Sequence, residues 1–416
     1  MLIAIERMKM QVRRTMNKEQ KKSNNDIDNM LVNLIAASRS AISRTDLQYS
    51  TKLSKMTISK HIAHLMECGI VSEDGYKDDG NVPMGRRQIA LKISDQSPLI
   101  CGVYLRRNYC RVILTDISCK IVFSEIQWLS QEITAEGLVK LILTMIRNLK
   151  SKTKRVIVGC GISTFGPVDC REGCIVSPPN FFGIEYVALT KPIECELQIP
   201  TILVHDVSGS AVAERVFGNA KNMDNFLHVH LQNGNGIGSE VYLNGSFLNL
   251  PSGRGGEIGH TSINCFGEYC SCGKRGCLEQ YANLERMQRR VREMLPVFRS
   301  SQLGKSGDPA WEDILKQAIE GDPVALCVLE EFSEYLAVAI SNCIHLYGVS
   351  NVVIGYDCPA AVPIIERLVK EKLERTAFHF GDESIQVVSS YFAGDGPLFG
   401  AVAVIAQKIF EQEITI

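Results

Sequence analysis

Residues 253–260, GRGGEIGH, are followed by residues 270–279, CSCGKRGCLE. Zinc prefers four nitrogen or sulfur ligands in a tetrahedron, and this stretch offers one histidine and three cysteines. Glycines between the cysteines let the chain turn tightly around an ion. We therefore expect a closed, structural zinc site, with reduced and packed thiols as the alternative. The four expected ligands are His260, Cys270, Cys272 and Cys277.

Two carboxylates flank this cluster. Glu257 precedes His260 by three residues, and Glu279 follows Cys277 by two. Carboxylates accept hydrogen bonds from neighbouring hydroxyl groups of a sugar. A loop held by a metal ion would fix both side chains rigidly over one cavity.

The N-terminal part of the chain predicts a DNA-binding module. Residues 26–38 carry an apolar stripe at helical spacing, and Thr45 is expected to cap a short second helix. Ser54 is expected to cap a third helix, which ends at Gly69. Two short strands, 70–72 and 88–93, would form a wing. The pattern indicates a winged helix-turn-helix, with a three-helix protein-interaction domain as the alternative.

Within the third helix, Ile58, Ile62 and Leu65 share the face expected to pack inward. The polar first turns then face outward, toward the major groove of DNA, and the wing arginines reach the backbone. The expected DNA-contacting residues are Lys55, Met56, Thr57, Ser59, Lys60, Arg86 and Arg87.

Charge is distributed unevenly along the 416 residues. Residues 1–95 contain 16 Lys and Arg against 11 Asp and Glu, whereas the rest contains 29 against 35. A basic module attached to an acidic body fits a nucleic-acid partner for the module alone. Residues 1–24 are expected to form a basic N-terminal extension.

Downstream of residue 95, apolar strand patterns alternate with helical ones, which predicts an α/β architecture. No apolar run is long enough for a membrane helix, and the start of the chain lacks the features of a signal peptide. We therefore expect a cytoplasmic protein. Strands are expected at 99–105, 111–115, 121–127, 155–162, 202–204, 226–231, 239–243 and 351–354, and helices at 134–150 and 322–347.

Together, the winged module and the 253–279 stretch resemble the ROK family (repressors, open reading frames and kinases), in particular its regulators of the N-acetylglucosamine- and xylose-repressor type. The resemblance spans about residues 26–412 and implies a two-lobed, actin-like sugar-kinase body. The expected domains are the extension 1–24, the winged helix-turn-helix 25–95 and the ROK domain 96–416, with a small lobe of about 96–206 plus the C-terminal helix and a large lobe of about 207–390.

The resemblance also implies a sugar pocket. Asp206 matches the family's catalytic base, which we interpret as vestigial here, and His205 stands where the family usually has Asn. Gly166 matches a turn at the pocket edge. The implied sugar-binding residues are Asn180, His205, Asp206, Glu257, His260 and Glu279.

The phosphate-binding elements of the family's kinases are altered. Their first turn, Asp-x-Gly-Gly-Thr, reads Tyr104-Leu-Arg-Arg-Asn108 here. The second loop survives in part at residues 234–238, and a later Gly-Gly reads Gly355-Tyr356. Bulk is thus added where the backbone must approach a nucleotide, so no enzymatic activity is expected.

These observations predict a DNA-binding transcriptional regulator, a repressor of carbohydrate uptake or catabolism genes, that senses a sugar or sugar phosphate. One alternative is a sugar kinase with an N-terminal DNA module. Another is a regulator controlled by docking of a protein, such as a phosphotransfer-system component, with a vestigial pocket. Operator DNA read as two half-sites implies a homodimer or homotetramer.

Overall fold

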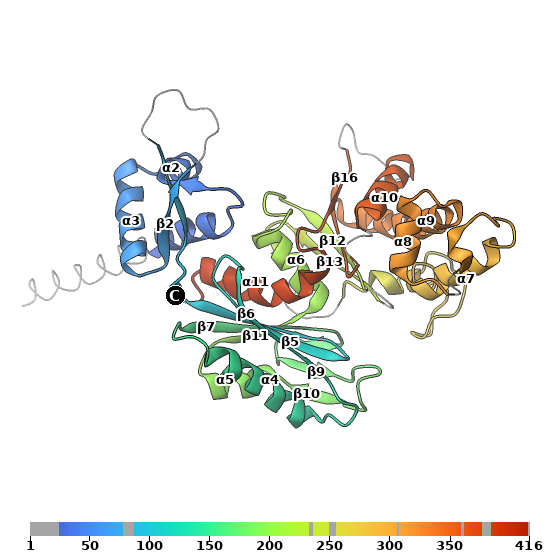
Figure 1. The fold of residues 1–416 in the computed structure, drawn as a ribbon, viewed down its shortest axis with the longest axis horizontal. Helices are drawn as coiled ribbons and strands as arrows, with labels where there is room; N and C mark the ends of the chain where they lie inside the picture. The colour runs from blue at the N-terminus through green and yellow to red at the C-terminus, as the bar shows by residue number, and fades with distance from the viewer. Residues whose placement is uncertain are drawn as a thin grey trace, which may run out of the picture.

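The computed structural model describes residues 25–77, 87–232, 236–248, 255–305, 308–358, 362–376 and 384–414. Its N-terminal module, blue in Figure 1, has a helix over residues 25–36, β1 (Ile42–Ser43), α2 (Arg44–Thr51) and α3 (Lys55–Glu67). β2 (Val71–Tyr76) and β3 (Ile89–Ile93) pair antiparallel, and the sheet order is β1-β3-β2. The module is a winged helix-turn-helix.

Capping residues set the two helices that follow β1. Ser43, not Thr45, caps α2: its hydroxyl accepts from the amide of Asp46, and the Asp46 carboxylate accepts from the amide of Ser43. The predicted cap was wrong because this reciprocal capping box satisfies two unpaired amides at once. Ser54 caps α3 as predicted, accepting from the amide of Thr57 at 3.1 Å.

The first lobe of the body is built on a five-stranded sheet of order β11-β7-β4-β5-β6. α4 (Ala135–Lys150) packs its buried stripe against this sheet, and α5 (Thr190–Leu197) packs beside β11. A small antiparallel sheet joins β8, β9 and β10. The strands are β4 (Leu99–Leu105), β5 (Tyr109–Thr115), β6 (Ile121–Trp128), β7 (Ile157–Thr164), β8 (Val168–Asp169), β9 (Cys174–Val176), β10 (Tyr186–Ala188) and β11 (Thr201–His205).

The second lobe has a sheet of order β14-β13-β12-β15-β16, with a group of helices beside it (Figure 1). α9 begins at Pro323, directly after its cap Asp322 and within one residue of the predicted start, and Tyr347 at its end is 41% exposed. The elements are β12 (Phe226–Leu231), β13 (Ile237–Leu243), β14 (Ser246–Phe247), β15 (Asn351–Tyr356), β16 (Gln386–Ser389), α7 (Leu284–Met294), α8 (Trp311–Ile319), α9 (Pro323–Tyr347) and α10 (Val362–Thr376).

Two helices lie between these parts, α6 (Asp206–Val216) and α11 (Gly396–Phe410), and they pack closely on each other (Figure 1). Glycine allows both the approach of α6 to α11, where a Cβ on Gly400 would lie 2.3 Å from the carbonyl carbon of Gly209, and that of α11 to β7, where a Cβ on Gly161 would lie 1.7 Å from the carbonyl oxygen of Ala401. The C-terminal helix is therefore fixed against the first-lobe sheet.

The DNA module contacts the body through a few polar groups. Arg39 donates to the carbonyl oxygen of Phe217 at 3.1 Å and to Asn219 at 2.9 Å, and its guanidinium lies 3.9 Å from the ring centroid of Tyr391. A cavity of about 500 Å³ lies at this junction. Because α6 begins at Asp206 and ends just before Phe217, one helix connects the predicted sugar site with this junction.

In the described ranges, every helix is either too short or too polar to span a bilayer.

Candidate functional site

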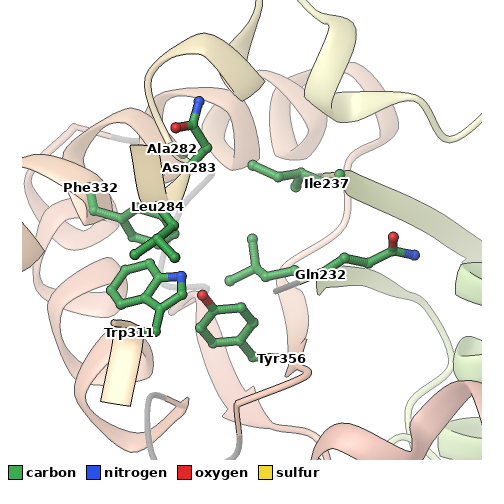
Figure 2. A pocket seen from close by; sticks show the side chains of 10 residues that line it. Gln232, Ile237, Ala282, Asn283, Leu284, Trp311, Phe332 and Tyr356 are labelled. Carbon is green, nitrogen blue, oxygen red and sulfur yellow. The ribbon is translucent and has the colours of Figure 1, made fainter. Parts of the chain in front are cut away.

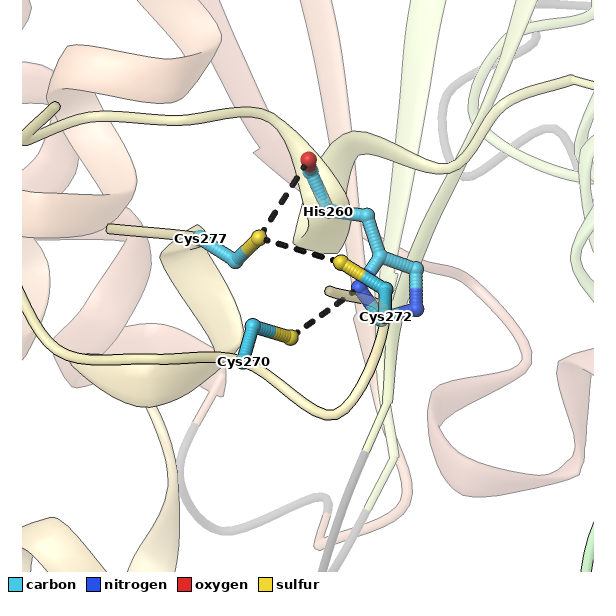
Figure 3. Close-up of side chains that lie close together, drawn as sticks. All are labelled: His260, Cys270, Cys272 and Cys277. Atoms are coloured by element: carbon cyan, nitrogen blue, oxygen red, sulfur yellow. Dashed lines mark hydrogen bonds between the residues drawn. The ribbon is translucent and has the colours of Figure 1, made fainter. Parts of the chain in front are cut away.

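The structure brings the four predicted metal ligands together (Figure 3). Their ligand atoms all lie within 4.8 Å of one another. The Nδ1 atom of His260 is 3.6 Å from Sγ of Cys270, and the sulfurs of Cys272 and Cys277 are also 3.6 Å apart. Burial and the neighbouring thiols raise the pKa of Cys277 to about 12, whereas the hydrogen bond with the backbone of Lys274 lowers the pKa of Cys272. The cluster can hold a metal ion.

The loop around this cluster also places the two predicted carboxylates. Glu257 precedes the short helix η1 (Ile258–His260) and is exposed, and Glu279 lies in η2 (Leu278–Gln280). Glu279 accepts from the amide of Ile237 at 3.2 Å and lies 3.7 Å from Nδ1 of His260. The start of β13 therefore positions the Glu279 carboxylate directly.

A second group of predicted residues lies at the first turn of α6. Asp206 is buried, and its carboxylate accepts from the side-chain amide of Gln232 at 2.7 Å. Nδ1 of His205 is 3.2 Å from the Asp206 carboxylate. A Cβ on Gly166 would lie 3.1 Å from the His205 ring, so this turn packs directly on the imidazole. Among the described residues, no direct hydrogen bond joins this group to Glu257 or Glu279.

Asn180 lies in a third position, on the exposed loop before residue 183, with a left-handed φ of 55°. The preceding residue, Pro179, accepts from Nε of Arg107 at 3.1 Å. The Arg107 guanidinium also lies 4.6 Å from the ring centroid of Phe165, the neighbour of Gly166. Arg107 thus connects the β4–β5 turn with two loops at the edge of the predicted sugar pocket.

The other arginine of this turn crosses to the second lobe. Nη1 of Arg106 lies 2.8 Å from the carboxylate of Asp357, directly after β15, and Nε2 of His230 lies 3.1 Å from the same carboxylate. Burial raises the pKa of Asp357, but the hydrogen bond with His230 and the charge of Arg106 outweigh it, so its pKa lies below the ordinary value. An ion pair therefore joins the lobes.

Beside this ion pair, the second lobe is filled by aromatic side chains (Figure 2). Tyr356 is 1% exposed and packs edge-on against Trp311, with ring centroids 5.7 Å apart. The cavity that remains next to Gln232 measures about 10 Å³, roughly the space of one water molecule. A purine base does not fit there in this arrangement.

In the DNA module, α3 presents the predicted face. Ile58, Ile62 and Leu65 are buried as predicted. His61 is buried as well, with Nδ1 2.8 Å from the carboxylate of Asp28 in the first helix. This contact holds α3 against the first helix. Four predicted DNA-contacting side chains are exposed: Lys55, Met56, Ser59 and Lys60.

The remaining residues predicted to contact DNA are Thr57, Arg86 and Arg87. Thr57 is half-buried, and its hydroxyl lies 2.8 Å from that of Ser54, so the cap occupies it. Arg87 is exposed, two residues before the start of β3. Arg86 lies outside the described residues, as do Gly253 and residues 234 and 235 of the second phosphate loop.

Comparison with known proteins agrees with this geometry. The model of the ROK family matches residues 100–408, which is most of the chain and nearly all of the two-lobed body. The chain belongs to the ROK family. The predicted resemblance to the ROK family and the predicted fold class are therefore confirmed. The fold includes the helical DNA module that precedes the ROK body in the chain.

Several ROK relatives match over nearly their whole length. The xylose repressor of Bacillus subtilis is 27% identical, over 89% of this chain and 93% of that protein. The DNA-binding transcriptional repressor Mlc of Escherichia coli is 25% identical, over 87% and 89%. A crystal structure of a ROK family transcriptional regulator, described as a homologue of the E. coli Mlc protein, superposes with a TM-score of 0.73 at 23% identity, covering 93% and 97%. This crystal structure supports the fold of the chain.

Three contacts of this ROK body are absent from the sequence-based prediction. Asp357 carries a signal for one of them, because a polar residue directly after a buried strand is a usual place for a functional group. Gln232 has the same signal at the end of β12. Arg107 was noted as an altered phosphate loop, but nothing local indicated that it reaches Pro179.

Proposed function

We propose that this chain is a DNA-binding transcriptional regulator, a repressor of carbohydrate uptake or catabolism genes, whose ROK body senses a sugar or sugar phosphate. The observation that carries the proposal is the exposed face of α3 on a module in direct contact with the ROK body. Lys55 and Lys60 supply charge for phosphates, and Met56 is 81% exposed beside them. The xylose repressor and Mlc names support the same role.

In this proposal the cluster of His260 and three cysteines binds structural zinc. Thiolates about 2.3 Å from a tetrahedral ion lie roughly 3.8 Å apart, and the sulfurs of Cys272 and Cys277 are 3.6 Å apart. Four protein ligands leave no open position for a substrate. Nδ1 of His260 faces the cluster, so binding of the ion there leaves Nε2 as a donor toward a ligand.

The sugar pocket of the proposal consists of Asn180, Glu257 and Glu279 with the His205–Asp206 turn. Glu257 and Asn180 are exposed and make no side-chain hydrogen bond within the described ranges, so both remain available to hydroxyl groups. A ligand bound to Asp206 would contact the first turn of α6. The opposite end of α6 meets Arg39, which provides a direct structural route to the DNA module.

We propose a regulator rather than a kinase because of the nucleotide side of the cleft. Arg106 spans from one lobe to Asp357 in the other, where backbone amides would have to cradle phosphates. Tyr356 and Trp311 fill the neighbouring space. A general base alone, such as Asp206, does not provide phosphoryl transfer, which depends on positioning and charge stabilisation.

A second candidate is control by a docking protein, for which a phosphotransfer-system component is the expected partner. Residues 257–279 form the metal-site loop. Within this loop, Phe266 is 89% exposed and Tyr269 is 70% exposed. Aromatic side chains of this kind are enriched where proteins associate. In this case the sugar pocket would be vestigial.

The experiment is selection of DNA from a random pool by the full-length protein, followed by binding titrations with and without sugars. We expect a palindromic site bound by a homodimer or homotetramer, with the midpoint shifted by at least one sugar or sugar phosphate. Glu279→Gln should raise the effective ligand concentration about ten- to hundred-fold, since each charge-assisted hydrogen bond contributes about 1.5–3 kcal/mol.

Glu334→Gln is the matched control, because Glu334 of α9 is exposed and contacts Lys372 of α10. It should leave the midpoint unchanged. Failure to enrich any DNA sequence would refute the regulator. DNA binding that ignores every sugar would favour the docking candidate.

A further inference from the structure

The two arginines of the β4–β5 turn do different things. Arg106 forms an ion pair with Asp357 across the lobes. Arg107 is half-buried, and within the described residues no carboxylate lies within ion-pairing distance of it. A partly desolvated guanidinium that forms no direct ion pair is unfavourable unless a ligand supplies one. Burial lowers the pKa of Arg107, and the charge of Asp206 offsets only part of this effect.

The position of Arg107 is set by two contacts at the edge of the predicted pocket. Nε is occupied by the carbonyl oxygen of Pro179, 3.1 Å away, next to Asn180. The guanidinium carbon lies 4.6 Å from the ring centroid of Phe165, which is buried. The two terminal nitrogens have no hydrogen-bond partner among the described residues. Their donors are therefore available, in a planar pair that matches a phosphate or carboxylate.

Charge is separated across the predicted pocket. Glu257 and Glu279 lie on the metal-site loop, where carboxylates accept from neutral hydroxyls. Arg107 lies on the opposite lobe, beside the Asn180 loop. The charge of Asp206 acts on Arg107, but the Asp206 carboxylate itself accepts hydrogen bonds from Gln232 and from the amide of Val207. A ligand with hydroxyls at one end and one negative charge at the other matches this arrangement.

We propose that the effector is an anionic sugar, one that carries a single phosphate or carboxylate, and that Arg107 binds this group. The inference rests on the proposed sugar-sensing function and names its ligand class. A neutral sugar leaves the Arg107 guanidinium without a direct ion-pair partner, so it binds more weakly than its anionic derivative. Arg107→Gln removes this preference, whereas the hydroxyl contacts of Asn180 and Glu279 are retained.

The test is calorimetric titration of the full-length, zinc-loaded protein with matched ligands. The sets are glucose, glucose 6-phosphate and glucuronate, and N-acetylglucosamine with its 6-phosphate; inorganic phosphate alone controls for adventitious anion binding. We expect one anionic sugar to bind at least about tenfold more tightly than its neutral parent, and Arg107→Gln to remove that difference, as expected for one charge-assisted hydrogen-bond pair. The 6-phosphate and glucuronate arms show which anion the site takes.

Arg299→Gln is the control, because it makes the same charge change at an exposed position. Equal affinity for neutral and anionic sugars, or equal weakening of both by Arg107→Gln, would overturn the inference while leaving sugar sensing intact. Binding of inorganic phosphate as tight as that of the sugar phosphate would also overturn it. If no ligand of either set binds the wild-type protein, the proposed sugar sensing fails, and the inference fails with it.

Discussion

Replacing Arg106 by alanine should weaken the contact between the two lobes by a measurable amount. The Asp357 side chain is 7% exposed and that of Arg106 is 27% exposed, so the pair is largely shielded from water. Removal of one partner from a buried pair costs about 3–5 kcal/mol, and the remaining exposure and the His230 contact reduce this cost. We therefore expect Arg106→Ala to destabilise the body by about 2 kcal/mol.

The assay is a double-mutant cycle by denaturant unfolding of the wild type, Arg106→Ala, Asp357→Ala and the double variant. The coupling energy should be about 1.5–3 kcal/mol. The control is Arg111→Ala, which removes a 3.2 Å pair with Asp395 that also joins separate parts of the body but is 29% and 52% exposed. Exposed pairs contribute about 0–1 kcal/mol.

The carboxylate of Asp357 should also make the stability of the fold depend on pH. Because the folded-state pKa of Asp357 lies below the ordinary value of 3.8, its stabilising effect is present above that pH and is lost as the pH falls through the folded pKa. Asp357→Asn should remove this part of the acid sensitivity. Zero coupling between Arg106 and Asp357, or equal effects at Arg106 and Arg111, would refute the proposed connection between the lobes.

Three further outcomes are expected. Elemental analysis should find one zinc per chain in the wild type and a loss of zinc in Cys272→Ser. Cys265→Ser is the control and should keep its zinc, because Cys265 is exposed and lies outside the cluster. A full zinc content in Cys272→Ser would exclude the assigned ligands. Lys60→Ala should flatten the slope of log affinity against log salt by up to about one unit, and an unchanged slope would place α3 away from the phosphates. Sugar-dependent ADP release should stay at background with glucose, mannose, N-acetylglucosamine and N-acetylmannosamine, and turnover that disappears in Asp206→Ala would restore the kinase.

Local patterns predicted much of the fold. β4 and β12 have the predicted bounds, because each is a buried apolar run between polar turns. α9 starts where Asp322 and Pro323 place it. α6 was not predicted, since its Ser, Gly and Ala residues are buried on nearly all sides between the lobes and leave no apolar stripe to recognise.

Part of the candidate site can likewise be predicted from local sequence patterns, and part of it cannot. The metal cluster could be predicted because its three cysteines fall within eight residues of one another. The Arg106–Asp357 pair could not, because its partners are 251 residues apart and only the packing of two sheets brings them together. The contact between Arg107 and Pro179 is equally non-local.

The central claim is that occupancy of the ROK pocket changes the affinity of the winged helix-turn-helix for DNA. The most direct measurement is fluorescence anisotropy of the full-length protein on its selected DNA site, at fixed salt, across the sugar and sugar-phosphate sets. We predict that at least one ligand changes the dissociation constant about tenfold or more, as for coupling energies of 1–3 kcal/mol, and that Glu279→Gln raises the ligand concentration required. An affinity for DNA that stays constant across every ligand, in a protein shown by calorimetry to bind one of them, would contradict the account.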